Sequence, residues 1–194
     1  MAGAAKGMTN VILITIGTGI GGGVIIDGKI FEGGKSGGTE IGHTSLVVDG
    51  EQCNCGRKGC FEVYASANAL VRTALKTSSE NKDSLLHSMY LNEGEMNGRI
   101  PFEAAKLGDE AAIAVVNNYI KYLGEGIVNM VNIFRPDIVL LSGGISEQGE
   151  FLTNPLNEYM LRYAYAGSKI FIPEIKKATL GNDAGIIGAA NLFK

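Results

Sequence analysis

VILITIGTGIGGGVII, residues 11–26, is the stretch that decides the fold of this chain. Its first six residues are aliphatic or β-branched, which predicts a buried strand over Val11–Ile16. The next glycines contain a literal G-x-G-x-x-G, but a dinucleotide-binding fingerprint requires that motif to open a helix. Here the glycines lead into an apolar run and the Asp27–Gly28 turn. The sequence therefore predicts strands joined by hairpins.

The glycine-rich turn at residues 17–23 is a candidate phosphate-binding loop. Such a turn exposes successive backbone N–H groups beside the Thr18 hydroxyl, and a concavity of this kind binds phosphate oxygens. The later Gly34-Lys35-Ser36 is not a P-loop, because that motif needs glycine where this chain has Lys29. On glycine density alone, a plain turn without a ligand remains the alternative.

Strand and helix signals alternate along the rest of the chain, which predicts an α/β domain whose sheet is flanked by helices. Asp109 is the expected N-cap of a long helix that ends before the Arg135–Pro136 pair. The further predicted strands are 24–26, 29–31, 44–48, 138–141 and 169–172, and the predicted helices are 61–77, 109–134, 152–163 and 184–193.

Composition and charge restrict the class of protein. A chain of 194 residues with 45% hydrophobic and 19% charged residues has an ordinary globular composition. A formal net charge of −3 gives no electrostatic reason to expect nucleic acid or an anionic membrane as a partner. The longest apolar run is too short to span a bilayer, and MAGAAKGMTN at the start lacks the apolar core of a secretory signal. We expect a cytoplasmic protein.

The run CNCGRKGC, residues 53–60, lies ten positions after a histidine. Three thiolates and one imidazole make the closed tetrahedral donor set of a structural zinc site, and glycines within the run allow a tight loop. Unrelated thiols or a disulfide are the alternative, but an odd count leaves one thiol over and residues two apart rarely bridge well. The predicted zinc ligands are His43, Cys53, Cys55 and Cys60.

Two glutamates accompany this metal pattern: Glu40 comes three residues before His43, and Glu62 comes two after Cys60. A ligating histidine leaves its second ring nitrogen free to bond an outside group. Two carboxylates and one imidazole N–H suit vicinal hydroxyls, because a carboxylate accepts from two directions while the N–H donates. The pattern predicts polyol recognition, with solvated surface carboxylates as the alternative.

Four motifs in order resemble one family: TIGTGIGGG at 15–23, EIGH at 40–43, CNCGRKGCFE at 53–62 and LSGGIS at 141–146. Together they resemble the ROK family of repressors, open reading frames and sugar kinases, over essentially the whole chain. Ile16 replaces the first glycine of the family's phosphate hairpin. The resemblance implies the actin-like ATPase (ribonuclease H-like) fold, with residues 1–194 as the C-terminal lobe of a two-lobed sugar kinase.

The resemblance also implies roles for individual residues and for their cofactors. The hairpin would hold the phosphates of ATP with Mg²⁺, and a later glycine pair would lie beside the adenosine. The residues implied to bind ATP are Gly17, Thr18, Gly19, Gly21, Gly143 and Gly144. The residues implied to contact a hexose are Glu40, His43 and Glu62, and the zinc ligands are those predicted above.

Two motifs of the family's other lobe have no counterpart in this sequence. One is a D-x-G-G-T phosphate loop, and the other is an N-D-A-N-like segment whose Asp accepts the proton of the sugar hydroxyl. The opening of this chain resembles the family's sequence just after that Asp. We therefore expect a fragment that has no catalytic base of its own and is inactive alone.

Among kinases, the cysteine loop is most like those of bacterial glucokinases and N-acylmannosamine kinases. The expected activity of the full-length protein is ATP-dependent phosphorylation of a hexose, from glucose to glucose 6-phosphate. The alternative is the sugar-sensing domain of a ROK transcriptional repressor; the intact phosphate hairpin favours the kinase. A zinc module for protein interaction would leave the hairpin and residues 142–144 unexplained. We expect the helix at 184–194 to pack on the missing lobe, and the protein to form a homodimer or larger homo-oligomer.

Overall fold

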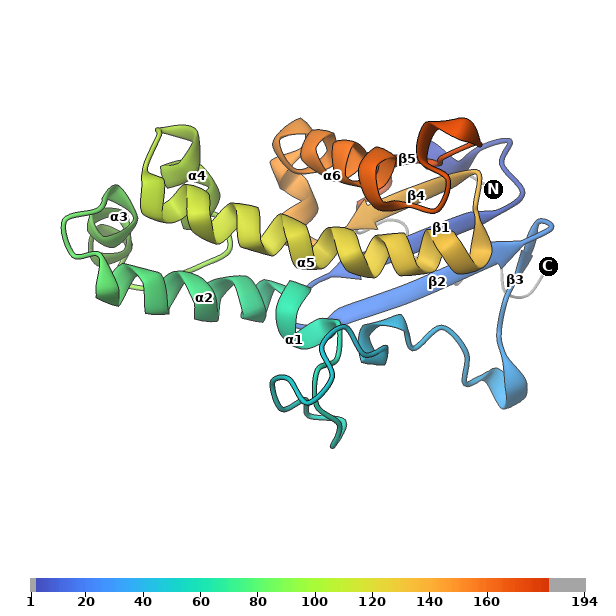
Figure 1. Cartoon of the computed structure of the whole chain (residues 1–194), viewed down its shortest axis with the longest axis horizontal. Helices are drawn as coiled ribbons and strands as arrows, with labels where there is room; N and C mark the ends of the chain where they lie inside the picture. The colour runs from blue at the N-terminus through green and yellow to red at the C-terminus, as the bar shows by residue number, and fades with distance from the viewer. Residues whose placement is uncertain (1–2, 182–194) are drawn as a thin grey trace.

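The structure, a computed structural model, describes residues 3–181. A mixed sheet lies at its centre, with the strand order β3-β2-β1-β4-β5 (Figure 1). The strands are β1 (Val11–Ile16), β2 (Ile20–Ile26), β3 (Lys29–Ile30), β4 (Ile138–Ser142) and β5 (Glu174–Lys177). β2 runs antiparallel to β1 and β3, whereas β4 runs parallel to β1 and β5. The expected strand at Val11–Ile16 is confirmed, and the turn between β2 and β3 has positive φ at both Asp27 and Gly28.

Helices cover one face of the sheet and extend beyond its end. They are α1 (Glu62–Ala65), α2 (Ala67–Glu80), α3 (Leu85–Glu93), α4 (Ile100–Lys106), α5 (Glu110–Phe134) and α6 (Glu150–Tyr163). The long α5 crosses the sheet with α6 beside it, while α2, α3 and α4 lie past the strands (Figure 1). As expected, the Asp109 side chain accepts the Ala112 N–H at the start of α5, and the helix ends at Phe134 with Arg135 as its C-cap. No helix within residues 3–181 combines the length and apolarity needed to cross a membrane.

The main core lies between the sheet and α5. Alternate residues of β1 face the helices and are buried, including Ile12 and Ile14, and β4 contributes Val139 and Leu141. Two α5 glycines allow close packing, because a Cβ at Gly126 would lie 2.2 Å from the Phe61 ring and one at Gly124 would lie 2.7 Å from Tyr159. The opposite face of the sheet carries a smaller cluster: Ala5, Val11, Ile138 and Leu140.

Several expected elements are wrong or displaced. Residues 44–48 form no strand; only the isolated bridge Ser45↔Cys60 pairs there, because this segment folds back on the cysteine loop. The strand expected at 169–172 is found at 174–177, since Pro173 has no N–H to donate to a ladder. The helix expected at 61–77 is broken at Ser66, which caps α2 by accepting the Ala69 N–H. The helix expected at 184–193 lies outside the described residues.

Candidate functional site

The parallel pairing of β1 and β4 brings two glycine segments to one edge of the sheet. Thr15 pairs with Ser142, so the turn after β1 and the glycine pair after β4 meet at the carboxyl ends of both strands. Gly143 has φ +92°, and a Cβ there would lie 2.2 Å from the Ile16 carbonyl oxygen, so only glycine fits. A Cβ at Gly144 would meet nothing within 4 Å. In sheets of this kind, ligands bind at such an edge.

The turn between β1 and β2 presents backbone donors. The Gly17 N–H closes the turn by bonding the Gly19 carbonyl oxygen at 3.0 Å. Within residues 3–181, the N–H groups of Thr18 and Gly19 donate to no protein acceptor, and Thr18 is exposed. Two adjacent free amides beside a hydroxyl have the chemistry to bind an anion. Gly21, which the resemblance implies to bind ATP, has little free space beside it, because a Cβ there would lie 3.0 Å from the Thr15 hydroxyl oxygen.

Glu62 reaches this turn from the start of α1. Its Oε2 accepts the N–H of Ile20 at 3.0 Å, although the two residues are 42 positions apart in sequence. A Cβ on Gly19 would lie 2.2 Å from the same oxygen. Nearby, the Ala67 N–H donates to the Gly17 carbonyl oxygen at 2.9 Å. The predicted sugar-binding carboxylate therefore lies against the predicted phosphate hairpin, which no local sequence pattern indicates.

The E-x-G-H segment also packs on the hairpin. A Cβ at Gly42 would lie 2.3 Å from the Ile20 carbonyl oxygen, and one at Gly22 would lie 2.7 Å from Ile41. The Thr39 hydroxyl donates to the Gly22 carbonyl oxygen at 3.0 Å. These contacts seat a short 3-10 turn, Ile41–His43, against β2. Glu40 is exposed just before this turn, and His43 is half-buried at its end.

The predicted metal ligands converge. The ligand atoms of His43, Cys53, Cys55 and Cys60 all lie within 4.8 Å of one another. The Cys53 Sγ is 3.6 Å from the His43 Nδ1, and the sulfurs of Cys55 and Cys60 are also 3.6 Å apart. Tetrahedral zinc with Zn–S bonds of about 2.3 Å would hold two sulfurs about 3.8 Å apart, so the spacing fits. All three cysteines are free thiols, which excludes the disulfide alternative in this structure.

The sulfurs of the cluster differ in how easily they ionise. Burial raises the pKa of the Cys60 thiol to about 12, and the neighbouring sulfurs of Cys55 and Cys53 act in the same direction. The pKa of Cys55, at the exposed rim, is lowered chiefly by the backbone N–H of Arg57. Without a metal these effects keep the Cys60 thiol protonated; bound zinc would displace that proton and neutralise the thiolate charge.

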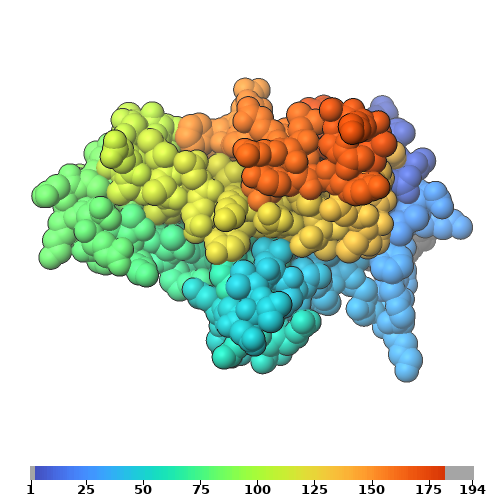
Figure 2. Space-filling view, in the orientation of Figure 1, coloured from blue at the N-terminus to red at the C-terminus, as the bar shows by residue number. Residues whose placement is uncertain are grey.

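The loop that carries the cysteines projects from the body of the molecule below α5 (Figure 2). Gly59 has φ +76°, and a Cβ there would lie 1.6 Å from the Val47 carbonyl oxygen, so glycine is required. The Tyr64 hydroxyl accepts the Glu51 N–H at 2.7 Å. Arg72 of α2 forms an exposed ion pair with the Glu51 carboxylate at 3.2 Å. Sequence reasoning missed Tyr64, whose contact joins α1 to the loop across 13 residues.

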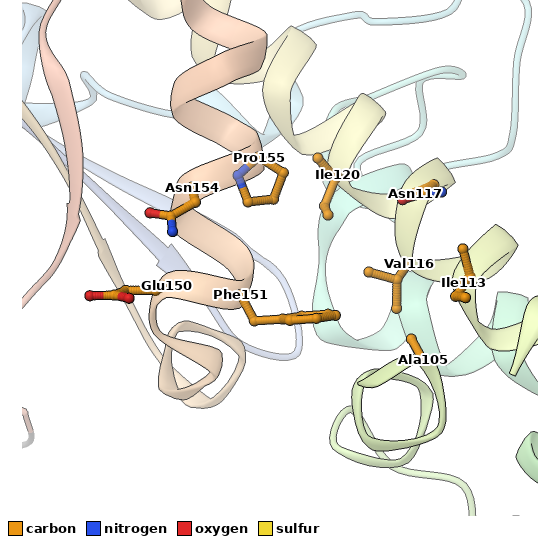
Figure 3. A pocket seen from close by; sticks show the side chains of 9 residues that line it. All are labelled: Ala105, Ile113, Val116, Asn117, Ile120, Glu150, Phe151, Asn154 and Pro155. Carbon is orange, nitrogen blue, oxygen red and sulfur yellow. The ribbon is translucent and has the colours of Figure 1, made fainter. Parts of the chain in front are cut away.

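A separate apolar cavity of about 420 Å³ lies between α4, α5 and α6. Figure 3 shows the Phe151 ring lying flat across it, while the Glu150 and Asn154 side chains point away from α5. It contains none of the predicted ligand residues. The lining residues are Ala105, Ile113, Val116, Asn117, Ile120, Glu150, Phe151, Asn154 and Pro155.

Comparison with known proteins finds the ROK family and two glucokinases. The model of the ROK family matches residues 1–194. A glucokinase of Halalkalibacterium halodurans is 39% identical over 194 residues, covering 99% of this chain and 58% of that protein. The crystal structure of a ROK family glucokinase from Streptomyces griseus in complex with glucose and AMPPNP is 33% identical with a TM-score of 0.87, covering 97% of this chain and 62% of that one.

A second class of relative is also found. The xylose repressor of Bacillus subtilis is 30% identical over 192 residues, which cover 98% of this chain and 45% of the repressor. The chain thus spans about 60% of the glucokinases it matches and less than half of the repressor. The expected actin-like ATPase fold is confirmed by the likeness to the glucokinase structure.

Proposed function

Because the chain belongs to the ROK family, we propose that the full-length protein phosphorylates a hexose with ATP, converting glucose into glucose 6-phosphate. The observation that supports this most is the contact between Glu62 and the β1–β2 hairpin. It places a carboxylate suited to sugar hydroxyls beside two free amides suited to phosphate. A phosphotransferase needs its acceptor and its phosphoryl donor adjacent in this way.

In this proposal, the chain's residues position both substrates. Glu40 and Glu62 accept hydrogen bonds from sugar hydroxyls, and the free ring N–H of His43 donates one. The amides of Thr18 and Gly19 bind phosphate oxygens, and the turn at residues 143–144 lies beside the adenosine. Bound zinc would fix the orientation of the His43 ring, and Mg²⁺ would accompany ATP.

The proton acceptor is the part of the reaction that we assign outside this chain. We propose that an Asp in a preceding lobe accepts the proton of the sugar 6-hydroxyl as that oxygen attacks the γ-phosphorus in line. Phosphoryl transfer depends mainly on positioning and charge stabilisation. The 194-residue chain alone should therefore show no ATP-dependent phosphorylation of glucose. Measurable turnover by the purified chain would show that the base lies within it.

The test is a coupled assay of ADP formation by the full-length protein, with glucose, mannose, fructose and N-acetylmannosamine each supplied as the substrate. We expect glucose to give the highest kcat/KM. Glu40→Ala should raise the KM for glucose about tenfold or more, since a hydrogen bond to a charged group contributes about 1.5–3 kcal/mol. Gly34→Ala is a suitable control, because a Cβ there meets nothing within 4 Å. Binding of glucose without phosphorylation of any hexose would contradict the proposal.

That contrary outcome would support the second candidate, a sugar-sensing domain of a transcriptional repressor. The similarity to the xylose repressor over 98% of this chain favours it. The free amides of the hairpin favour the kinase, because a sensor that only binds sugar has no use for a phosphate cradle. A helix-turn-helix upstream of this chain in the gene would indicate the repressor, and a catalytic Asp would indicate the kinase.

A further inference from the structure

We propose that Glu62 links the sugar site to the phosphate hairpin, so that bound hexose and bound nucleotide strengthen each other's binding. This rests on the proposed function. The half-buried Glu62 carboxylate has two oxygens, and Oε2 already accepts the Ile20 N–H at 3.0 Å. Within residues 3–181, Oε1 accepts no hydrogen bond and remains available to a sugar hydroxyl. One side chain can therefore hold the hairpin and the sugar together.

The Glu62 side chain fills the space beside Gly19. A Cβ on Gly19 would lie 2.2 Å from Oε2 and 2.9 Å from Cδ of Glu62, both closer than real Cβ contacts. Gly19 belongs to the predicted phosphate turn, yet the space beside it is filled by protein. Because the clashing atoms are the far end of a flexible side chain, a methyl group there would displace the carboxylate without breaking the fold.

The segment that begins with Glu62 holds both ends of the turn. The Ile20 N–H bonds to Glu62, and the Gly17 carbonyl oxygen accepts the Ala67 N–H at 2.9 Å. The amides of Thr18 and Gly19, which donate to no acceptor within the described part of the chain, lie between these two points. A hexose that fixes the Glu62 side chain therefore also fixes the turn that presents the amides to phosphate. By linkage, nucleotide bound to the turn must raise hexose affinity by the same factor.

The test is calorimetric titration of the full-length protein with glucose, alone and with saturating Mg²⁺–AMPPNP. In the wild type, we expect the nucleotide to raise glucose affinity about fivefold or more. In Gly19→Ala, glucose affinity without nucleotide should fall about tenfold, as expected for a lost hydrogen bond to a charged group, and the nucleotide effect should nearly vanish. Gly34→Ala is the control, because this glycine lies outside the hairpin and a Cβ there would meet nothing within 4 Å. It should bind glucose like the wild type.

Equal glucose affinities for Gly19→Ala and Gly34→Ala in the absence of nucleotide would overturn the link while leaving the proposed function intact. Failure of the wild type to bind any hexose would overturn both. A second measurement needs no ligand: amide hydrogen exchange at Ile20 should quicken about tenfold or more in Glu62→Ala, since its acceptor is lost. An unchanged exchange rate at Ile20 would also overturn the proposal.

Discussion

Loss of the predicted zinc should disorder the cysteine loop and leave the sheet folded. Among residues 44–60, only Cys53, Gly59 and Cys60 are buried, so the loop has almost no apolar core of its own. The main core between α5 and the sheet is separate from it. Cys55→Ser is the sharpest perturbation, because Cys55 is exposed and a serine there changes little besides the metal ligand.

The magnitudes show why the metal decides the outcome. Fixing the backbone costs about 1–2 kcal/mol per residue, or roughly 12–24 kcal/mol for residues 49–60. Structural zinc supplies about 10–16 kcal/mol in small zinc-binding peptides. Backbone hydrogen bonds such as the Cys53 N–H to the Arg57 carbonyl oxygen, at 2.8 Å, contribute about 0.5–1.5 kcal/mol each. Bound zinc would therefore be the largest single contribution to the order of the loop.

Trypsin offers a direct assay, because Arg57 and Lys58 are exposed within the loop. We expect one zinc per chain by elemental analysis and slow cleavage of the wild type at these two sites. Cys55→Ser, or wild type treated with a chelator, should lose zinc and be cut rapidly there. Asn54→Ser, a neighbouring exposed change that removes no ligand, should behave like the wild type. Absence of zinc from the purified wild type, or equal cleavage of Cys55→Ser and Asn54→Ser, would refute this reasoning.

Three further predictions concern stability. Gly126→Ala should cost about 1–3 kcal/mol in urea unfolding, because its Cβ would overlap the Phe61 ring. Gly143→Ala should cost roughly 1–3 kcal/mol through backbone strain, whereas Gly144→Ala, in open space, should leave the urea midpoint unchanged. The backbone N–H groups of Asn10 and Thr9, just before β1, lower the pKa of Asp137. The ionised Asp137 carboxylate therefore stabilises the folded state above its unfolded-state pKa, and this stabilisation is lost as pH falls through the folded-state pKa. In Asp137→Asn, the free energy of unfolding should therefore decrease less steeply with falling pH below about pH 4 than in the wild type.

The strands and the long helix could be predicted because their signals are local. Val11–Ile16 is an unbroken apolar run, and α5 begins at a capping Asp and ends before a proline. Residues 44–48 carry a similar β-branched pattern but are held instead by the Gly59 carbonyl oxygen, which accepts the N–H of Leu46 at 2.7 Å. Such a long-range contact overrides the local preference, and no property of the segment itself reveals it.

The same distinction applies to the site. The metal cluster is visible in the sequence because cysteine spacing within one tight loop fixes the distances between the sulfurs. The contact of Glu62 with Ile20 spans 42 residues and depends on where α1 lies relative to β2. The contact of Tyr64 with Glu51 depends equally on the path of the loop. Spacing predicted candidate members of the site, and only the fold could show which of them touch.

The glycines of the site divide into two physical classes that a motif cannot separate. A Cβ at Gly17 or Gly144 would meet nothing within 4 Å, so a ligand can occupy that space. A Cβ at Gly143 would strike the Ile16 carbonyl oxygen at 2.2 Å, so glycine is needed there even without a ligand. A Cβ at Gly19 would strike the Glu62 carboxylate at 2.2 Å and would displace this flexible side chain. Alanine at the first class should therefore act mainly on nucleotide affinity, and alanine at the second mainly on stability or on neighbouring side chains. Gly19 belongs to the second class because of Glu62, which makes a change in the proposed phosphate hairpin a test of the proposed sugar site.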